Sequence, residues 1–140
     1  MRTPIGIVVG VVVLSASCAT ELYPGPRKSD SELVYLKTDG TKIVAIDGIR
    51  LRSGTGSFAV LPGVHGVSVV LQDPQYGALQ WGLLFYSNDP LTLCFKGYAG
   101  NAYYVRPRYN AKLWKPEMMS AKTTELISVR RIDGPSRNCL

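Results

Sequence analysis

Histidine is nearly absent from this chain, and its absence limits the chemistry that the chain can perform. The 140 residues contain one histidine, His65, and no Gly-x-Ser-x-Gly nucleophile motif. A zinc site takes about four ligands, which one histidine and a few cysteines supply poorly. His65 follows a Pro-Gly turn and opens an apolar run, so a partly buried structural residue is favoured over a general base or metal ligand. The sequence therefore predicts no catalytic residue, no metal and no cofactor; a hydrolase is the less favoured alternative.

Long apolar runs are also lacking. The longest, residues 5–14, is too short for a membrane-spanning helix, which needs about 20 residues. Arg2 precedes this run and the small residues Ala16 and Ser17 follow it, directly before Cys18. This pattern is typical of an export signal, and it resembles bacterial lipoprotein signals, in which cleavage precedes a cysteine that receives a lipid. The chain departs from that pattern at Ser15, where Leu is usual, so an ordinary secretory cleavage nearby is the alternative.

The leader predicts the domain organisation and the location. Residues 1–17 are predicted to be a signal peptide, residues 18–31 a lipidated cysteine and extended tether, and residues 32–140 one domain. Ala19 follows Cys18, at the position where an Asp would act as a retention signal. In the lipoprotein class, the absence of that Asp implies the periplasmic face of the outer membrane. Without residues 1–17 the net charge is +5, because Arg2 is the only charge lost. An exported protein does not ordinarily meet nucleic acid, so the expected partners are a membrane, through the lipid anchor, and another envelope protein.

Short apolar runs separated by turns predict an all-β fold. Residues 42–46 read as a strand that ends at Asp47-Gly48, a strong hairpin signal. In residues 79–86, Leu79, Trp81, Leu83 and Phe85 alternate with the residues between them, which is typical of an amphipathic strand. With turns every eight to twelve residues, the chain is expected to form an antiparallel β-sandwich of about 7–9 short strands, with at most one short helix near residues 116–122.

The three cysteines are expected to have two different roles. If Cys18 carries a lipid, Cys94 and Cys139 remain as an even pair in an oxidising compartment. Alternation in residues 91–95 places Cys94 on the face opposite Leu93, away from the core, where a C-terminal tail could reach it. We therefore predict a Cys94–Cys139 disulfide, with two free thiols in a reducing cytosol as the alternative.

Two stretches resemble known families. Cys18, followed by Tyr-Pro-Gly-Pro at residues 23–26 and a Ser-Glu-Leu-Val strand at residues 31–34, is similar to a group of small Gram-negative lipoproteins. The Asp-Gly hairpin and the Leu-Pro-Gly-Val-His-Gly-Val run at residues 61–67 resemble PEGA-type and carboxypeptidase-regulatory β-sandwich modules, with Gly66 in place of the usual Thr. This resemblance implies a β-sandwich and a usually non-catalytic module, and it assigns no site residues.

One segment is the best candidate for a binding surface. Residues two apart share a face of a strand, so Tyr104, Arg106 and Arg108 should project together, with Trp114 nearby. Arginine pairs with phosphate or carboxylate, and tyrosine stacks on sugars or partner side chains. The expected function is a non-enzymatic interaction or structural module of the cell envelope. The alternative is a binder of anionic lipid headgroups, glycolipid or glycan through this Tyr/Arg face, and a merely solvated sheet face is the simplest interpretation.

Overall fold

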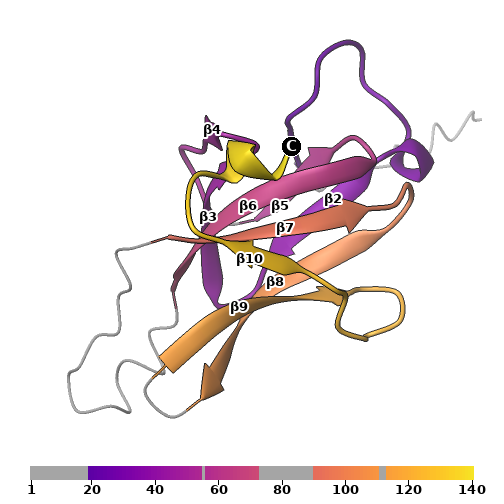
Figure 1. Cartoon of the computed structure of the whole chain (residues 1–140). Coiled ribbons are helices and arrows are strands. Elements are labelled where there is room, and N and C mark those ends of the chain that lie inside the picture. Colours follow the sequence, from indigo (N-terminus) through magenta and orange to yellow (C-terminus); the bar gives the residue numbers. More distant parts are fainter. Residues whose placement is uncertain (1–18, 55, 73–89, 111–112) are drawn as a thin grey trace, which may run out of the picture.

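The structure of the chain, a computed structural model, describes residues 19–54, 56–72, 90–110 and 113–140 (Figure 1). These residues form two five-stranded β-sheets. The predicted all-β sandwich is therefore confirmed, with ten strands in place of about 7–9 because two of them span only two residues each. Cys18 and the strand expected at residues 79–86 lie outside the described residues.

The first sheet has the strand order β1-β5-β2-β8-β9. Its strands are β1 (Thr20–Glu21), β5 (Ser57–Val60), β2 (Val34–Thr38), β8 (Ala102–Asn110) and β9 (Leu113–Ser120). Two of its pairings, β1 with β5 and β2 with β8, are parallel, which differs from the purely antiparallel arrangement expected. Strands β2 and β8 lie far apart in the sequence, so no short hairpin constrains them to run in opposite directions.

The second sheet has the order β10-β7-β6-β3-β4 and is antiparallel throughout. Its strands are β10 (Arg130–Ile132), β7 (Leu91–Gly97), β6 (Gly63–Leu71), β3 (Thr41–Ile46) and β4 (Ile49–Arg50). The predicted β3–β4 hairpin is present, and its turn residues Asp47 and Gly48 have φ angles of 51° and 82°. Positive φ at both central positions is what a type I′ turn requires.

The core lies between the two sheets. Alternate residues of the strands face it, and those contributed by one sheet pack against those of the other. The buried cluster comprises Val34, Leu36, Phe58, Val60, Tyr103, Val105 and Met118 of the first sheet and Ile43, Ile46, Val67, Val69, Leu93 and Phe95 of the second. The side chains at the alternate positions of the same strands point away from this core.

The helix considered near residues 116–122 does not form. Those residues belong largely to β9, which pairs with β8 over its whole length and buries Pro116 and Met118. Pro116 lies opposite Pro107, at a point where β2 no longer pairs with β8. A missing N–H is tolerated there, because neither proline needs to donate to a further strand. Long-range pairing with β8 thus overrides the local helical pattern.

Part of the segment that was expected to be an extended tether, residues 18–31, belongs to the folded domain. Thr20 pairs with Phe58 in β1, and the Leu22 amide donates to the Ala59 carbonyl at 2.9 Å. A 3₁₀ helix, η1 (Asp30–Glu32), follows, and the Tyr35 hydroxyl donates to the Asp30 carboxylate. This hydrogen bond, with burial, raises the pKa of Tyr35 to about 12. Residues on both sides of the Pro-Gly-Pro sequence are therefore held against the first sheet.

The chain changes sheets after β9. The Ile127 amide donates to the Met118 carbonyl at 3.0 Å, so residues 125–127 run beside β9. The chain then enters the second sheet as β10, where Arg131 lies opposite Leu93 of β7. A final 3₁₀ helix, η2 (Ser136–Cys139), packs on the outer face of this sheet (Figure 1).

Candidate functional site

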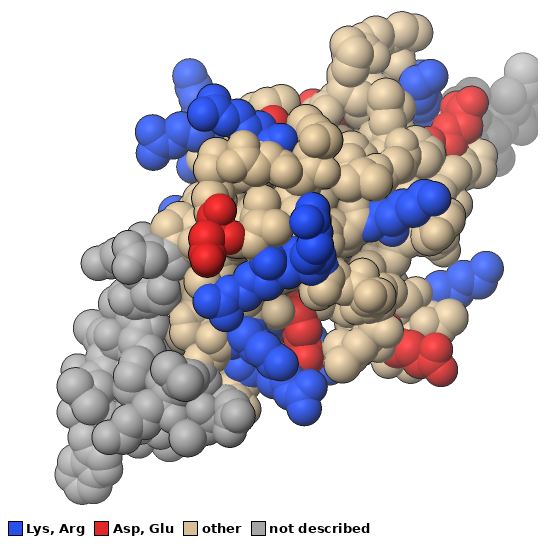
Figure 2. Space-filling model, in the orientation of Figure 1, with Lys and Arg blue, Asp and Glu red and all other residues tan. Residues whose placement is uncertain are grey.

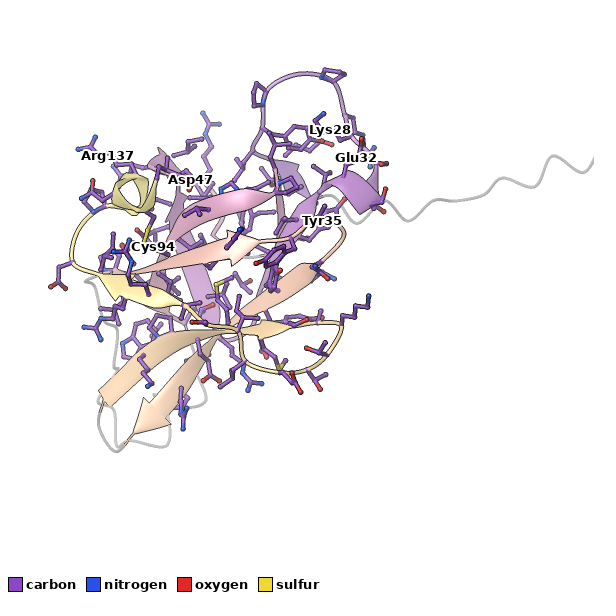
Figure 3. All side chains as sticks on the ribbon, turned by 45° about the vertical axis from the view of Figure 1, so that its right-hand side comes forward. Lys28, Glu32, Tyr35, Asp47, Cys94 and Arg137 are labelled. Atoms are coloured by element: carbon purple, nitrogen blue, oxygen red, sulfur yellow. A yellow bond between two sulfur atoms is a disulfide. The ribbon has the colours of Figure 1, made fainter. Side chains whose placement is uncertain are left out.

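The C-terminal helix is joined covalently to the second sheet. Cys94 and Cys139 form the predicted disulfide, with their Cα atoms 5.3 Å apart. Cys94 faces away from the core, as the alternation of β7 predicts, but η2 covers it, so only 6% of its surface is exposed. In Figure 3, Cys94 lies below η2 and Asp47 lies beside it. The disulfide therefore anchors the end of the chain on this face.

Gly66 makes this arrangement possible. It lies opposite Cys94 in the β6–β7 pairing. A Cβ atom at Gly66 would stand 2.0 Å from the Ser136 carbonyl oxygen and 2.8 Å from the Cys139 sulfur. No side chain fits in that space. The absence of a side chain at Gly66 is thus what admits η2.

Hydrogen bonds hold the same segment along the sheet. The Ser68 and Thr92 hydroxyls are 2.9 Å apart, and the Thr92 hydroxyl donates to the Gly134 carbonyl at 2.7 Å. The Gly48 amide donates to the Ser136 hydroxyl at 2.7 Å. We call residues 133–139 with these contacts the C-terminal clamp. It covers small and polar residues that would otherwise face solvent.

His65 and Asp47 lie at one end of the clamp. His65 Nδ1 is 2.5 Å from Asp47 Oδ2, and His65 Nε2 is 2.5 Å from the Leu61 carbonyl oxygen. The Gly66 amide donates to Asp47 Oδ1 at 2.8 Å. With an ionised Asp47, both ring partners are acceptors, so the ring satisfies them best as an imidazolium that donates from both nitrogens.

The direction in which the pKa of His65 is shifted follows from these contacts. Burial by itself lowers the pKa of His65, but the hydrogen bonds to Asp47 and to the Leu61 carbonyl outweigh it, and the pKa is raised above its usual value. Both ring nitrogens are engaged, which supports a structural role. Sequence reasoning assigned Asp47 to the turn alone; nothing in the local sequence signals that it also binds a residue 18 positions later.

The predicted Tyr/Arg face exists on β8. Tyr104, Arg106 and Arg108 alternate with buried Tyr103 and Val105, so the three share the outer side of the strand. The side chain of Arg106 is committed, because its Nε donates to Glu117 Oε1 at 2.9 Å. The Lys37 ammonium lies 5.8 Å from the centre of the Tyr104 ring. On this face the charge of Arg106 is therefore balanced by Glu117, whereas the ring contact leaves the charge of Lys37 in place.

Trp114 does not belong to that face. It lies opposite Tyr109 in the β8–β9 pairing and packs against the core cluster. Residues 115 and 117 of β9 lie opposite Arg108 and Arg106, so the outer positions of β9 are the odd-numbered ones. The sequence placed Trp114 near the arginines because it could not show that the chain reverses direction between them.

Positive charge is concentrated in the last third of the chain. Residues 90–140 contain nine Lys and Arg against three Asp and Glu, whereas residues 1–89 contain seven of each. Figure 2 shows Lys and Arg side chains in a band across the face on which β9 and β10 lie. Two cavities adjoin this region, of about 620 Å³ beside Asp39, Arg106 and Glu117 and of about 320 Å³ between β9 and residues 126–131.

Within the described ranges, no group of three or more His, Cys, Asp or Glu residues is placed to hold a metal ion. The helices in this part of the chain are both too short and too polar to cross a membrane.

The fold and its clamp define a small β-sandwich domain closed by a disulfide, with a basic edge. No protein-family model matches this chain, and neither a curated protein nor a solved structure matches it. The resemblances to small lipoproteins and to PEGA-type modules therefore stay predictions.

Proposed function

We propose that this chain is an exported lipoprotein, held at a bacterial membrane by a lipid on Cys18 and acting as a non-enzymatic interaction module of the cell envelope. One observation carries the proposal: Arg2, the apolar run of residues 5–14 and the small residues before Cys18 stand in the order of a lipoprotein signal. The proposed location is the periplasmic face of the outer membrane, since Ala19 follows the cysteine.

The disulfide supports export. Disulfides persist in oxidising compartments such as the periplasm and are rare in the cytosol. With Cys94 and Cys139 joined, Cys18 is the one cysteine left for modification. The pairing thus agrees with the use of the first cysteine as a lipid anchor.

The contacts of His65 support a role without catalysis. A general base must offer a free nitrogen to its substrate, and both nitrogens of His65 have partners within the domain. A binding role does not need such a group. The domain would present its surface to an envelope partner while the lipid sets its location.

The start of the first sheet supports close docking to the membrane. Thr20 already belongs to β1, two positions after Cys18. A lipid on Cys18 would therefore hold the folded domain near the headgroups, leaving no room for a long spacer. A partner on the same membrane is favoured over a distant one.

Mass spectrometry of the mature N-terminus tests the lipid anchor. The expected product begins at Cys18 and carries a diacylglyceryl group, and Cys18→Ser should abolish both the modification and membrane retention. A soluble product that begins elsewhere would overturn the anchor. Crosslinking in intact envelopes, with Cys18→Ser as the control, would test the partner: the proposal expects one dominant protein adduct that depends on the anchor, and its absence would overturn the interaction role.

A second candidate function is the binding of an anionic ligand, and the surplus of basic residues after residue 89 favours it. Anionic vesicles test this function directly. Binding should weaken when salt is added, because exposed charges are screened. Equal binding to neutral vesicles would exclude it.

A further inference from the structure

The sandwich is open along one edge, between β9 and β10. Residues 125–127 pair with β9, whereas residues 130–132 pair with β7 in the other sheet. The chain between them passes from one layer to the other, and Figure 1 shows β9 and β10 diverging from this crossing. A cavity of about 320 Å³ occupies the space that they leave, at the small end of the range for ligand pockets.

The floor of this cavity is apolar. Leu93, Pro116, Ile127 and Val129 line it. Leu93 belongs to the buried core, and Ile127 and Val129 pack against that core. The cavity therefore reaches from the surface to the hydrophobic layer, where an alkyl chain is better accommodated than water.

The rim of the cavity is cationic. Arg108, Lys115 and Arg131 line it and come from β8, β9 and β10. The one acidic residue in the lining, Glu117, is paired with Arg106 at 2.9 Å. Among the described residues, none of the three cations takes part in an ion pair. Three like charges around one opening repel one another, and an anion bound there would relieve that repulsion.

The neighbouring cavity lacks this surplus. Two basic residues, Arg106 and Arg108, line it together with two acidic residues, Asp39 and Glu117. The cavity at the edge between β9 and β10 thus combines an uncompensated cationic rim with an apolar floor. That combination matches a molecule with an anionic end and an apolar chain.

We infer that this edge cavity binds a single-chain alkyl phosphate, with the phosphate at Arg108, Lys115 and Arg131 and the first part of the chain against Leu93, Ile127 and Val129. A phosphate monoester carries nearly two negative charges at neutral pH, which suits three cations better than a single carboxylate does. The inference rests on the anionic-ligand function proposed above, and it moves the site from the face of β8 to the edge beside it.

The test uses the whole chain with Cys18→Ala and dodecyl phosphate below its micellar concentration, measured by calorimetry. Dodecyl phosphate should bind at least tenfold more tightly than inorganic phosphate, which lacks the chain, and than dodecyl maltoside, which lacks the charge. Dodecanoate should bind more weakly than dodecyl phosphate. Equal affinity for any of these three comparison molecules would overturn the inference.

Matched variants locate the site. Lys115→Gln with Arg131→Gln should weaken dodecyl phosphate binding at least tenfold. Lys28→Gln with Lys122→Gln removes the same net charge from exposed residues outside the cavity and should change the affinity less than twofold. Equal losses in the two double variants would mean that only the net charge matters, which overturns the site. Circular dichroism checks that both variants remain folded.

Vesicle binding distinguishes a failure of this inference from a failure of the anionic-ligand function on which it rests. Salt-sensitive binding of the parent chain to anionic vesicles, without binding of dodecyl phosphate, would overturn the edge cavity and leave the anionic-ligand function standing. If the parent chain bound neither anionic vesicles nor dodecyl phosphate, the edge cavity and the anionic-ligand function would both be overturned.

Discussion

The outer faces of the two sheets differ in the size, charge and burial of their side chains. On the second sheet, the clamp covers Gly66, Ser68, Thr92 and Cys94, which are small or polar and largely buried. On the first sheet, β8 and β9 carry long charged side chains that stay partly or fully exposed. The contrast shows that a polar residue facing outward does not by itself mark a functional surface. A face can be polar because solvent covers it or because the chain's own terminus does.

Loss of the disulfide should produce the largest effect on the covered face. In the loop-entropy model, a bridge that closes a separation of 45 residues contributes about 4 kcal/mol to the free energy of unfolding. Urea unfolding of Cys94→Ala with Cys139→Ala should show a loss of this order, and the reduced parent chain should match the variant. An unchanged unfolding midpoint would mean that hydrogen bonds alone hold the clamp.

Gly66→Ala should come next, with a loss of about 3 kcal/mol, because its Cβ would meet the Ser136 backbone at 2.0 Å. The comparison variant is Ala99→Val, which adds volume at an exposed turn residue and should change stability by less than about 0.5 kcal/mol. Chemical denaturation of the oxidised proteins measures both. If Gly66→Ala were as stable as the parent, η2 could not lie on β6 as described.

The His65–Asp47 pair predicts how stability depends on pH. The pKa of His65 is raised in the folded state, so the protonated form stabilises the fold. This contribution is fully present below the unfolded pKa of about 6.5 and is lost as the pH rises through the higher folded value. Urea midpoints between pH 5 and pH 9 should therefore fall with rising pH, apart from other groups that titrate.

Asp47→Asn isolates the charge of that pair. Asparagine tolerates the positive φ of the turn and keeps an oxygen for the Gly66 amide, but it offers His65 no carboxylate. The variant should lose about 2 kcal/mol at pH 6 and less at pH 9, the order expected for a hydrogen bond between charged groups. The same loss at both pH values would show that the turn, not the ion pair, is what the aspartate supports.

The exposed face should give the smallest stability effects. The Arg106–Glu117 ion pair is partly solvated, with 37% of the arginine side chain exposed, so Arg106→Ala should cost less than about 1 kcal/mol. Arg108→Ala should cost almost nothing. In vesicle binding the order should reverse, since Arg108 lines the edge cavity and Arg106 is neutralised by Glu117. A larger binding loss from Arg106→Ala would restore the face of β8 as the site.

The sequence predicted local features well. The Asp47-Gly48 hairpin is where turn chemistry placed it, and the outer face shared by Tyr104, Arg106 and Arg108 follows from alternation. The Cys94–Cys139 pairing was predicted from the outward direction of one strand residue and from the even pair of cysteines that remains if Cys18 carries a lipid. Each of these depends on residues close in sequence or on counting, and such information needs no knowledge of which strands are neighbours.

Features that depend on strand neighbours could not be predicted. Residues 116–120 are in a strand because β8 pairs with them, although their own pattern also suited a helix. Trp114 faces the core because of the register between the same two strands.

The sequence by itself therefore determined the fold class, the turns and the cysteine pairing, since these arise from alternation, backbone preference and parity. The tertiary structure alone decided which charges are compensated. It brought Glu117 to Arg106, joined Asp47 to His65 and gathered Arg108, Lys115 and Arg131 around one apolar opening. The physical reason is that Coulomb interactions and packing depend on distances in space, and the distances between these residues are set by the order and register of the strands.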